Sequence, residues 1–142
     1  MECTVRWVGE QAGMSFLAET GSGHAVVMDG APEAGGRNLG PRPMEMLLAG
    51  TGGCTAFDVV LILKKGRQKV SGCEVSLKAE RAESDPKIFT QIHFHFVVRG
   101  KQLKPESVAR AISLSKEKYC SASIMLAKTA EITHDFEIIE ES

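Results

Sequence analysis

The chain has 142 residues, a formal net charge of −1 at pH 7, and a composition that is 43% hydrophobic and 25% charged. This length and composition are typical of one water-soluble globular domain, so we expect a single domain over residues 1–142. A nearly neutral chain without a cluster of Lys and Arg does not favour nucleic-acid binding, and the longest apolar run, residues 59–63, is far shorter than the ~20 residues of a membrane span.

The first residues do not have the basic and then apolar form of a signal peptide, so we expect a cytoplasmic protein without a membrane association. The first third of the chain predicts short strands, because apolar and polar residues alternate there between glycine-containing turns. The predicted strands cover residues 2–8, 14–19 and 24–29. Residues 30–43 are rich in Gly and Pro and predict a loop.

A long helix is predicted from about Pro43 to Arg67. Proline suits a first helical position, and basic residues suit a last turn. Apolar residues occur nearly all round this helix, which is typical of a buried central helix. Gly50, Gly52 and Gly53 each cost about 1 kcal/mol relative to alanine, so we expect another backbone to approach the helix closely beside Cys54.

The rest of the chain predicts two longer strands, a helix with a short helical continuation, and a last strand. These elements cover residues 70–83, 88–99, 105–120, 121–129 and 131–139. The order of strands, helix, strands, helix and strand indicates an α+β fold in which sheets cover a helical core.

The four cysteines do not form a zinc-binding or disulfide-scaffold pattern, because there is no C-x-x-C and no histidine at zinc spacing from them. Cys3 and Cys73 fall in predicted strands, and we expect both in the core. Cys54 follows a glycine cluster, and Cys120 lies at a predicted break between helical segments. These two settings leave redox chemistry and inert buried thiols as alternatives.

His93 and His95 point to one face of a predicted strand, but two ligands without a third rarely form a metal site. We therefore expect a solvated face there. The sequence predicts neither a bound metal nor a cofactor.

Two segments resemble the OsmC/Ohr family, whose name joins osmotically inducible protein C and organic hydroperoxide resistance. Residues 43–54 resemble the segment that leads into the reactive cysteine, and residues 116–123 resemble the segment that carries the second cysteine. The resemblance covers essentially the whole chain. It is closest to the YhfA-like branch, which is marked by Met-Glu-Met at residues 44–46 and by Cys-x-Ala-x-Asp-Val-Val at residues 54–60.

The resemblance implies a domain-swapped homodimer in which antiparallel sheets wrap around two central helices. It further implies a thiol peroxidase that reduces organic hydroperoxides. Cys54 would attack the peroxide and become a sulfenic acid, and Cys120 would resolve it as a disulfide, which protects the sulfur from irreversible over-oxidation. A dithiol such as a lipoyl group would then reduce the disulfide.

The family activates its cysteine with an arginine that is paired with a glutamate ten residues before the cysteine. That position is Met44 here, and Glu45 is one place away. The resemblance makes Arg37 or Arg42 the candidate activating cation, with Glu45 or Asp58 orienting it. Because Met44 stands where the family has its glutamate, two alternatives to a peroxidase stay open. One is a weakly active redox-sensing or binding dimer, and the other is a structural dimer with inert thiols.

Overall fold

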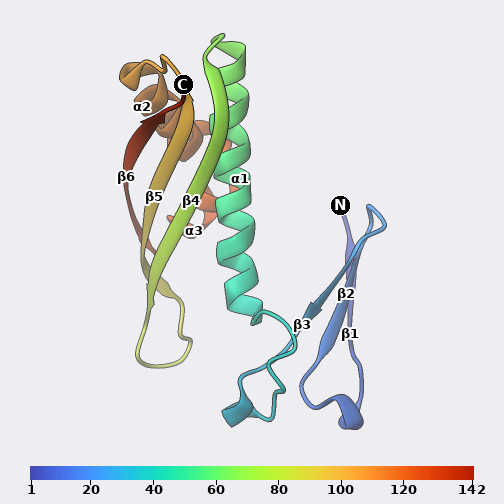
Figure 1. The fold of residues 1–142 in the computed structure, drawn as a ribbon. Coiled ribbons are helices and arrows are strands. Elements are labelled where there is room, and N and C mark those ends of the chain that lie inside the picture. Colours follow the sequence, from blue (N-terminus) through green and yellow to red (C-terminus); the bar gives the residue numbers. More distant parts are fainter. The chain divides into compact units, whose positions relative to one another are not determined.

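A computed structural model describes all 142 residues, which form two compact units, Met1–Leu48 and Ala49–Ser142. The first unit carries a three-stranded antiparallel sheet in the order β1-β2-β3. Its strands are β1 (Cys3–Trp7), β2 (Phe16–Thr20) and β3 (Ala25–Met28), with short 3-10 turns η1 (Glu10–Ala12) and η2 (Pro32–Ala34). The three strands predicted from alternation are confirmed (Figure 1).

The loop after β3 is organised by a buried carboxylate, Asp29. Its oxygens accept hydrogen bonds from Ser15 Oγ and from the backbone N–H groups of Gly30, Arg37 and Leu39. Burial alone opposes ionisation of Asp29, but these four donors outweigh it and lower the pKa of the carboxyl. The Gly- and Pro-rich segment is therefore an ordered loop held at one residue.

Helix α1 extends from Pro43 to Lys65. At its start the carboxylate of Glu45 accepts the backbone N–H of Arg42 at 2.9 Å, which is the return half of a capping box. The helix ends two residues before the predicted limit because Arg67 adopts a left-handed φ of 58°, and the backbone N–H groups of the closing turn bond back to the last helical carbonyls.

The second unit carries the sheet β4-β5-β6, formed by Lys69–Arg81, Phe89–Lys101 and Glu131–Glu140. Strands β4 and β5 are antiparallel, but β5 and β6 are parallel, so the prediction of antiparallel sheets is wrong for this pair. The reason is the helical crossover between them, because a chain that returns through helices can start its next strand in the same direction. The crossover consists of α2 (Pro105–Leu114), the π turn η3 (Ser115–Tyr119) and α3 (Ser121–Leu126).

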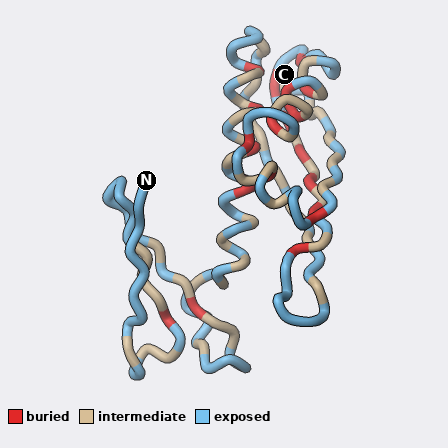
Figure 2. The backbone as a smooth tube through the Cα atoms, turned by 180° about the vertical axis from the view of Figure 1, so that it is seen from behind, coloured by how far each residue is buried: buried red, intermediate tan, exposed pale blue.

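The core of the second unit lies between one face of the sheet and the helices (Figure 2). Alternate residues of β5 are buried there, and they pack with apolar residues of α1 and α2. The buried side chains include Val59, Leu63, Ile92, Phe94, Phe96, Val98, Val108 and Ile112. Alternate burial is what one covered sheet face requires, and it leaves the other face of β5 open to solvent.

Only one side of α1 is buried in the single chain. Thr55, Val59 and Leu63 are packed, whereas Phe57 and Leu61 are exposed. By length and composition α1 is apolar enough to cross a membrane, but the core helix of a water-soluble protein passes the same test.

The three glycines of α1 differ in their surroundings. A Cβ on Gly52 would lie 2.8 Å from Leu77 Cδ1 of β4, while Gly50 and Gly53 have nothing within 4 Å. The predicted close approach therefore holds at Gly52 alone within this chain, and the neighbour is a side chain rather than a backbone.

Candidate functional site

The two thiols singled out from the sequence lie together in the second unit. Cys54 and Asp58 are four residues apart on α1 and so share one face of the helix. Cys120 comes from the crossover, 66 residues after Cys54 in the chain. The sulfur atoms of the two cysteines and a carboxylate oxygen of Asp58 all lie within 4.8 Å of one another.

The π turn determines where Cys120 lies. Its backbone N–H bonds to the Ser115 carbonyl five residues back, at 2.8 Å, and Cys120 then caps the start of α3. The N–H of Ser123 donates to the Cys120 sulfur at 3.4 Å. Such single wide turns interrupt helices and are frequent at functional sites. The predicted break between helical segments is confirmed, and Ser115 marks its start.

The two thiols differ in access. Cys120 has no exposed surface, while Cys54 is half-buried. Burial raises the pKa of the Cys120 thiol, and the neighbouring Cys54 raises it further, against the hydrogen bonds from Ser123. Cys54 is therefore the thiol that a solute can reach first.

A hydrogen-bond chain joins the helices behind the thiols. Ser115 Oγ donates to Asp58 Oδ2 at 2.9 Å, and Thr55 Oγ1 lies 2.9 Å from Ser115 Oγ. Because Ser115 gives its one proton to Asp58, Thr55 donates to Ser115. Asp58 is thus held by the first residue of η3, which fixes the carboxylate beside the two sulfurs.

A hollow of about 470 Å³ opens beside Asp58. Arg110 of α2, Lys65 of α1 and Tyr119 also line it, together with the apolar side chains of Leu61, Ile62 and Leu114. Sequence reasoning missed Arg110 as a cation near the site. No pattern marked it, since it lies on another helix and more than 50 residues after Cys54 in the sequence.

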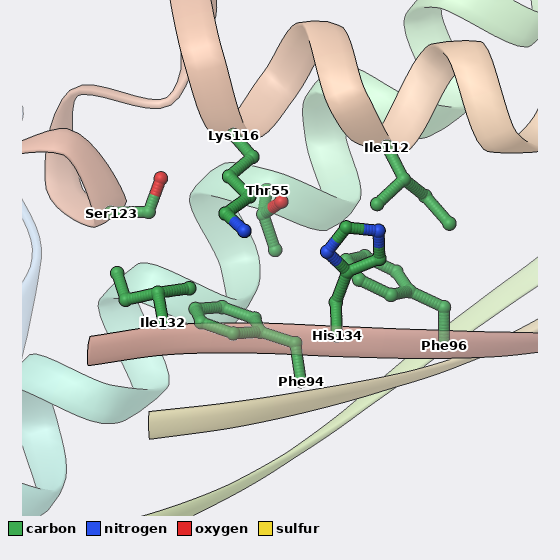
Figure 3. Close-up of a pocket in the computed structure, with 8 residues that line it drawn as sticks. All are labelled: Thr55, Phe94, Phe96, Ile112, Lys116, Ser123, Ile132 and His134. Carbon is green, nitrogen blue, oxygen red and sulfur yellow. The ribbon is translucent and has the colours of Figure 1, made fainter. Parts of the chain in front are cut away.

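A smaller cavity lies between α1, the crossover and the sheet, and Figure 3 shows its lining residues. Its volume of about 10 Å³ has room for about one water molecule. Lys116 and His134 both point into it, next to Thr55 and Ser123, which are chain neighbours or partners of the two thiols. Burial lowers the pKa of His134, and the charge of Lys116 lowers it further.

The other candidate residues belong to the first unit. Arg42 bonds to Asn38 through its guanidinium and pairs with Glu45 at 3.9 Å. Glu45 caps α1, as described above, and the backbone of Arg37 bonds to Asp29. These three residues lie in the first unit and the two thiols in the second, so the roles of the three stay predictions.

The remaining cysteines and histidines have separate surroundings. Cys3 is exposed rather than in the core, because all five residues of β1 are exposed in the single chain. Cys73 is half-buried, and burial raises its pKa. The expectation that His93 and His95 lie on an open face is confirmed, and both bond to Asp135 Oδ1, at 3.0 and 2.8 Å.

The fold and the site together define an α+β protein that holds two thiols from separate helices beside a carboxylate. Comparisons with known proteins place this arrangement in a family. The sequence description of OsmC-like proteins matches residues 35–135. Protein YhfA of Escherichia coli strain K12 is 50% identical over 139 residues, which are 98% of each chain.

Solved structures agree. A hypothetical protein from Aquifex aeolicus VF5 is 31% identical, with a TM-score of 0.85 over 99% of this chain and 97% of that one. An organic hydroperoxide resistance protein from Elizabethkingia anophelis shares the fold at 17% identity, with a TM-score of 0.71 over 98% and 97% of the two chains. The chain therefore belongs to the OsmC-like family, and its similarity to YhfA confirms the predicted branch.

Proposed function

We propose that this protein is a cytoplasmic thiol peroxidase that reduces organic hydroperoxides, with Cys54 as nucleophile and Cys120 as resolving thiol. The observation that carries the proposal is the pairing of two sulfurs within 4.8 Å of each other, one accessible and one fully buried. The hydroperoxide resistance named for one structural neighbour supports the same chemistry.

The disulfide forms in two steps, and one hydroperoxide is the oxidant for both. The Cys54 thiolate attacks the terminal oxygen of the hydroperoxide, the O–O bond breaks, and the alcohol leaves after the alkoxide takes a proton. Cys54 is then a sulfenic acid. The Cys120 thiolate attacks that sulfur and expels its oxygen as water, which forms the disulfide. A dithiol of the lipoyl type supplies the two electrons that restore both thiols.

Closing the disulfide requires little movement. A disulfide has an S–S distance of about 2.0 Å, and rotation of a cysteine side chain can move its sulfur by a few ångströms without displacing the backbone. Cys120 lies at the end of a π turn, where the chain changes from one helix to the next. This junction is a suitable place for the small adjustment that the bond needs.

The Cys54 thiolate needs an activating cation, and the chain offers two sources of one. Arg37 or Arg42, as the resemblance implies, is one source, with Glu45 or Asp58 orienting it. Arg110 is a second source, because it lines the same hollow as Asp58. A guanidinium next to Cys54 would favour the thiolate and the developing negative charge on the peroxide oxygen.

We further propose a domain-swapped homodimer that completes a single OsmC-like domain fold. The exposed Phe57 and Leu61 and the open Gly53 leave one face of α1 free to pack against the same helix of a second copy. Burial of large apolar side chains in this way is worth about 1.5–3 kcal/mol each. This would give the apolar composition all round α1 a physical reason.

Single-turnover oxidation tests the peroxidase proposal. The reduced protein is mixed with one equivalent of cumene hydroperoxide, and its intact mass is measured. We expect the loss of two hydrogen atoms in the parent, a trappable sulfenic acid at Cys54 in Cys120→Ser, and no reaction in Cys54→Ser. Cys73→Ser is the matched control and should behave as the parent. An unchanged parent mass contradicts the proposal.

A redox sensor that reacts once and is reduced slowly is the second candidate. It is favoured by Met44 at the family's glutamate position and by the engagement of Glu45 in capping the helix. Steady-state peroxide consumption with an excess of a dithiol separates the two, because a sensor forms the disulfide without sustained turnover.

A further inference from the structure

Three side chains with metal-binding atoms converge at the candidate site. The sulfurs of Cys54 and Cys120 and one carboxylate oxygen of Asp58 lie within 4.8 Å of one another. In a tetrahedral zinc site, Zn–S bonds of about 2.3 Å and Zn–O bonds of about 2.0–2.2 Å place neighbouring ligand atoms about 3.3–3.8 Å apart. The ligand atoms are therefore at most about 1.5 Å farther apart than in a coordination geometry, and side-chain rotation can close that gap.

The charges of the cluster favour a cation. No Lys, Arg or His of the chain pairs with Asp58, since the ion pairs join Arg6 with Glu19, Arg42 with Glu45, and two histidines with Asp135. Metal binding displaces the protons of the two thiols, so a bound cation would face two thiolates and a carboxylate, which its own charge offsets. A divalent cation supplies that charge at the point where the three atoms meet.

Two ligands are already held by hydrogen bonds from neighbouring groups. Ser115 donates to one oxygen of Asp58 and leaves the other oxygen available, and the Ser123 N–H donates to the Cys120 sulfur. Supporting bonds of this kind orient ligands in natural metal sites and raise metal affinity. Because these bonds already orient two of the three ligands, metal binding would need little reorganisation of the site.

We propose that the reduced Cys54–Cys120 pair and Asp58 bind a thiophilic divalent cation of the Zn²⁺ class, with a fourth position open to solvent. Two sulfur ligands exclude the hard cations Mg²⁺ and Ca²⁺, which prefer oxygen, and three protein ligands in a tetrahedron leave one position free. Zinc spacing in the sequence gave no sign of this site, because its third ligand is a carboxylate and its cysteines are far apart in the chain.

Metal binding and peroxide reaction exclude each other at Cys54. When a hydroperoxide takes two electrons from the thiols, the disulfide withdraws two ligands and the cation leaves with its oxidation state unchanged. This inference goes beyond the proposed peroxidase, because metal binding needs no turnover and would occur in an inactive protein as well. Zinc would then protect the reduced thiols and slow their oxidation.

The test uses Zn²⁺ titration calorimetry and Co²⁺ absorption on the reduced, oxygen-free protein. A Cys3→Ser/Cys73→Ser background removes the two other thiols, and we expect it to bind one cation per chain with the sulfur-to-cobalt absorption band of thiolate ligands. Cys54→Ser and Asp58→Asn should weaken binding by at least about 100-fold, and Ser115→Ala by about 10-fold, the size of a lost supporting bond. Asp58→Glu keeps a carboxylate and should retain more affinity than Asp58→Asn.

Three results overturn the proposal: an Asp58→Asn protein that binds Zn²⁺ as tightly as the background, binding that survives Cys54→Ser, or equal binding by the disulfide form. Circular dichroism of each variant verifies that it is folded, and Asp58→Glu provides a second comparison at the same position. The peroxide assay is run on chelator-treated protein, so a failure of the peroxidase proposal and a failure of the metal proposal are separate results.

Discussion

Ser115 donates a hydrogen bond to Asp58 at 2.9 Å and so connects the crossover to the carboxylate beside Cys54. The two residues are 57 positions apart in the chain. Because Ser115 also accepts the hydroxyl proton of Thr55, it is the central member of a buried three-residue chain. Removing it leaves two groups without their partner at once.

Ser115→Ala should lower the free energy of unfolding by about 1–3 kcal/mol, since the buried Thr55 hydroxyl loses its acceptor. Urea denaturation measures this loss. Ser113→Ala is the matched control, because Ser113 is half-buried two residues earlier, in α2, and makes no side-chain hydrogen bond. Equal stability of the two variants would show that the chain of hydroxyl groups contributes nothing.

The contact between Gly52 and Leu77 gives a second prediction. A side chain at position 52 starts 2.8 Å from Leu77 Cδ1, so Gly52→Val should overpack the interface of α1 with β4 and cost about 1–3 kcal/mol. In the double variant with Leu77→Ala, the total loss should be smaller than the sum of the single losses. Thermal or urea unfolding of the four proteins gives this coupling, and strict additivity would contradict the contact.

The order and kind of the elements were predictable because alternation, glycine turns and basic helix ends are local signals. The parallel pairing of β5 with β6 was missed, although the helical segment between them already favoured a crossover. The capping role of Glu45 could also have been predicted from the sequence, because Glu45 stands three residues after Arg42 at the start of the helix.

The site was less predictable than the fold. Cys54 and Cys120 could be proposed from their surroundings and the family resemblance, but the partner of Asp58 could not. Ser115 reaches Asp58 from the first position of the π turn, and no local pattern in the sequence marks that contact. Arg110 enters the same hollow through the packing of α2, so a contact of this kind depends on tertiary structure rather than on spacing.

The exposed face of α1 predicts that the protein is a dimer whose sedimentation coefficient does not change with protein concentration in the micromolar range. Phe57→Glu should shift the protein to a monomer in sedimentation velocity, because a charge would be buried against the second copy. Met125→Glu on α3 is the control, since Met125 is 67% exposed and Phe57 is 69% exposed. A Phe57→Glu protein that sediments like the parent would place the subunit contact elsewhere, and a monomeric parent would remove the dimer from the proposal.

His134 predicts how stability depends on pH. Burial, and then Lys116 and His93, lower its pKa from the ordinary 6.5, against smaller opposite effects of Asp135 and Glu117. Below pH 6.5 the unfolded chain therefore takes up a proton that the folded chain still rejects, so stability is complete above pH 6.5 and falls as the pH is lowered through the window below it.

Unfolding midpoints in urea at pH 7.5, 6.5 and 5.5 measure this dependence. His134→Asn should flatten it, because the neutral amide binds no proton, while His24→Asn should not, since His24 is exposed at the turn between β2 and β3. Lys116→Gln removes a positive charge from the same cavity, so the pKa of His134 followed by NMR should rise. A His134 resonance that titrates at its ordinary value in the parent would contradict the burial argument, because a solvated imidazole has no reason to reject its proton.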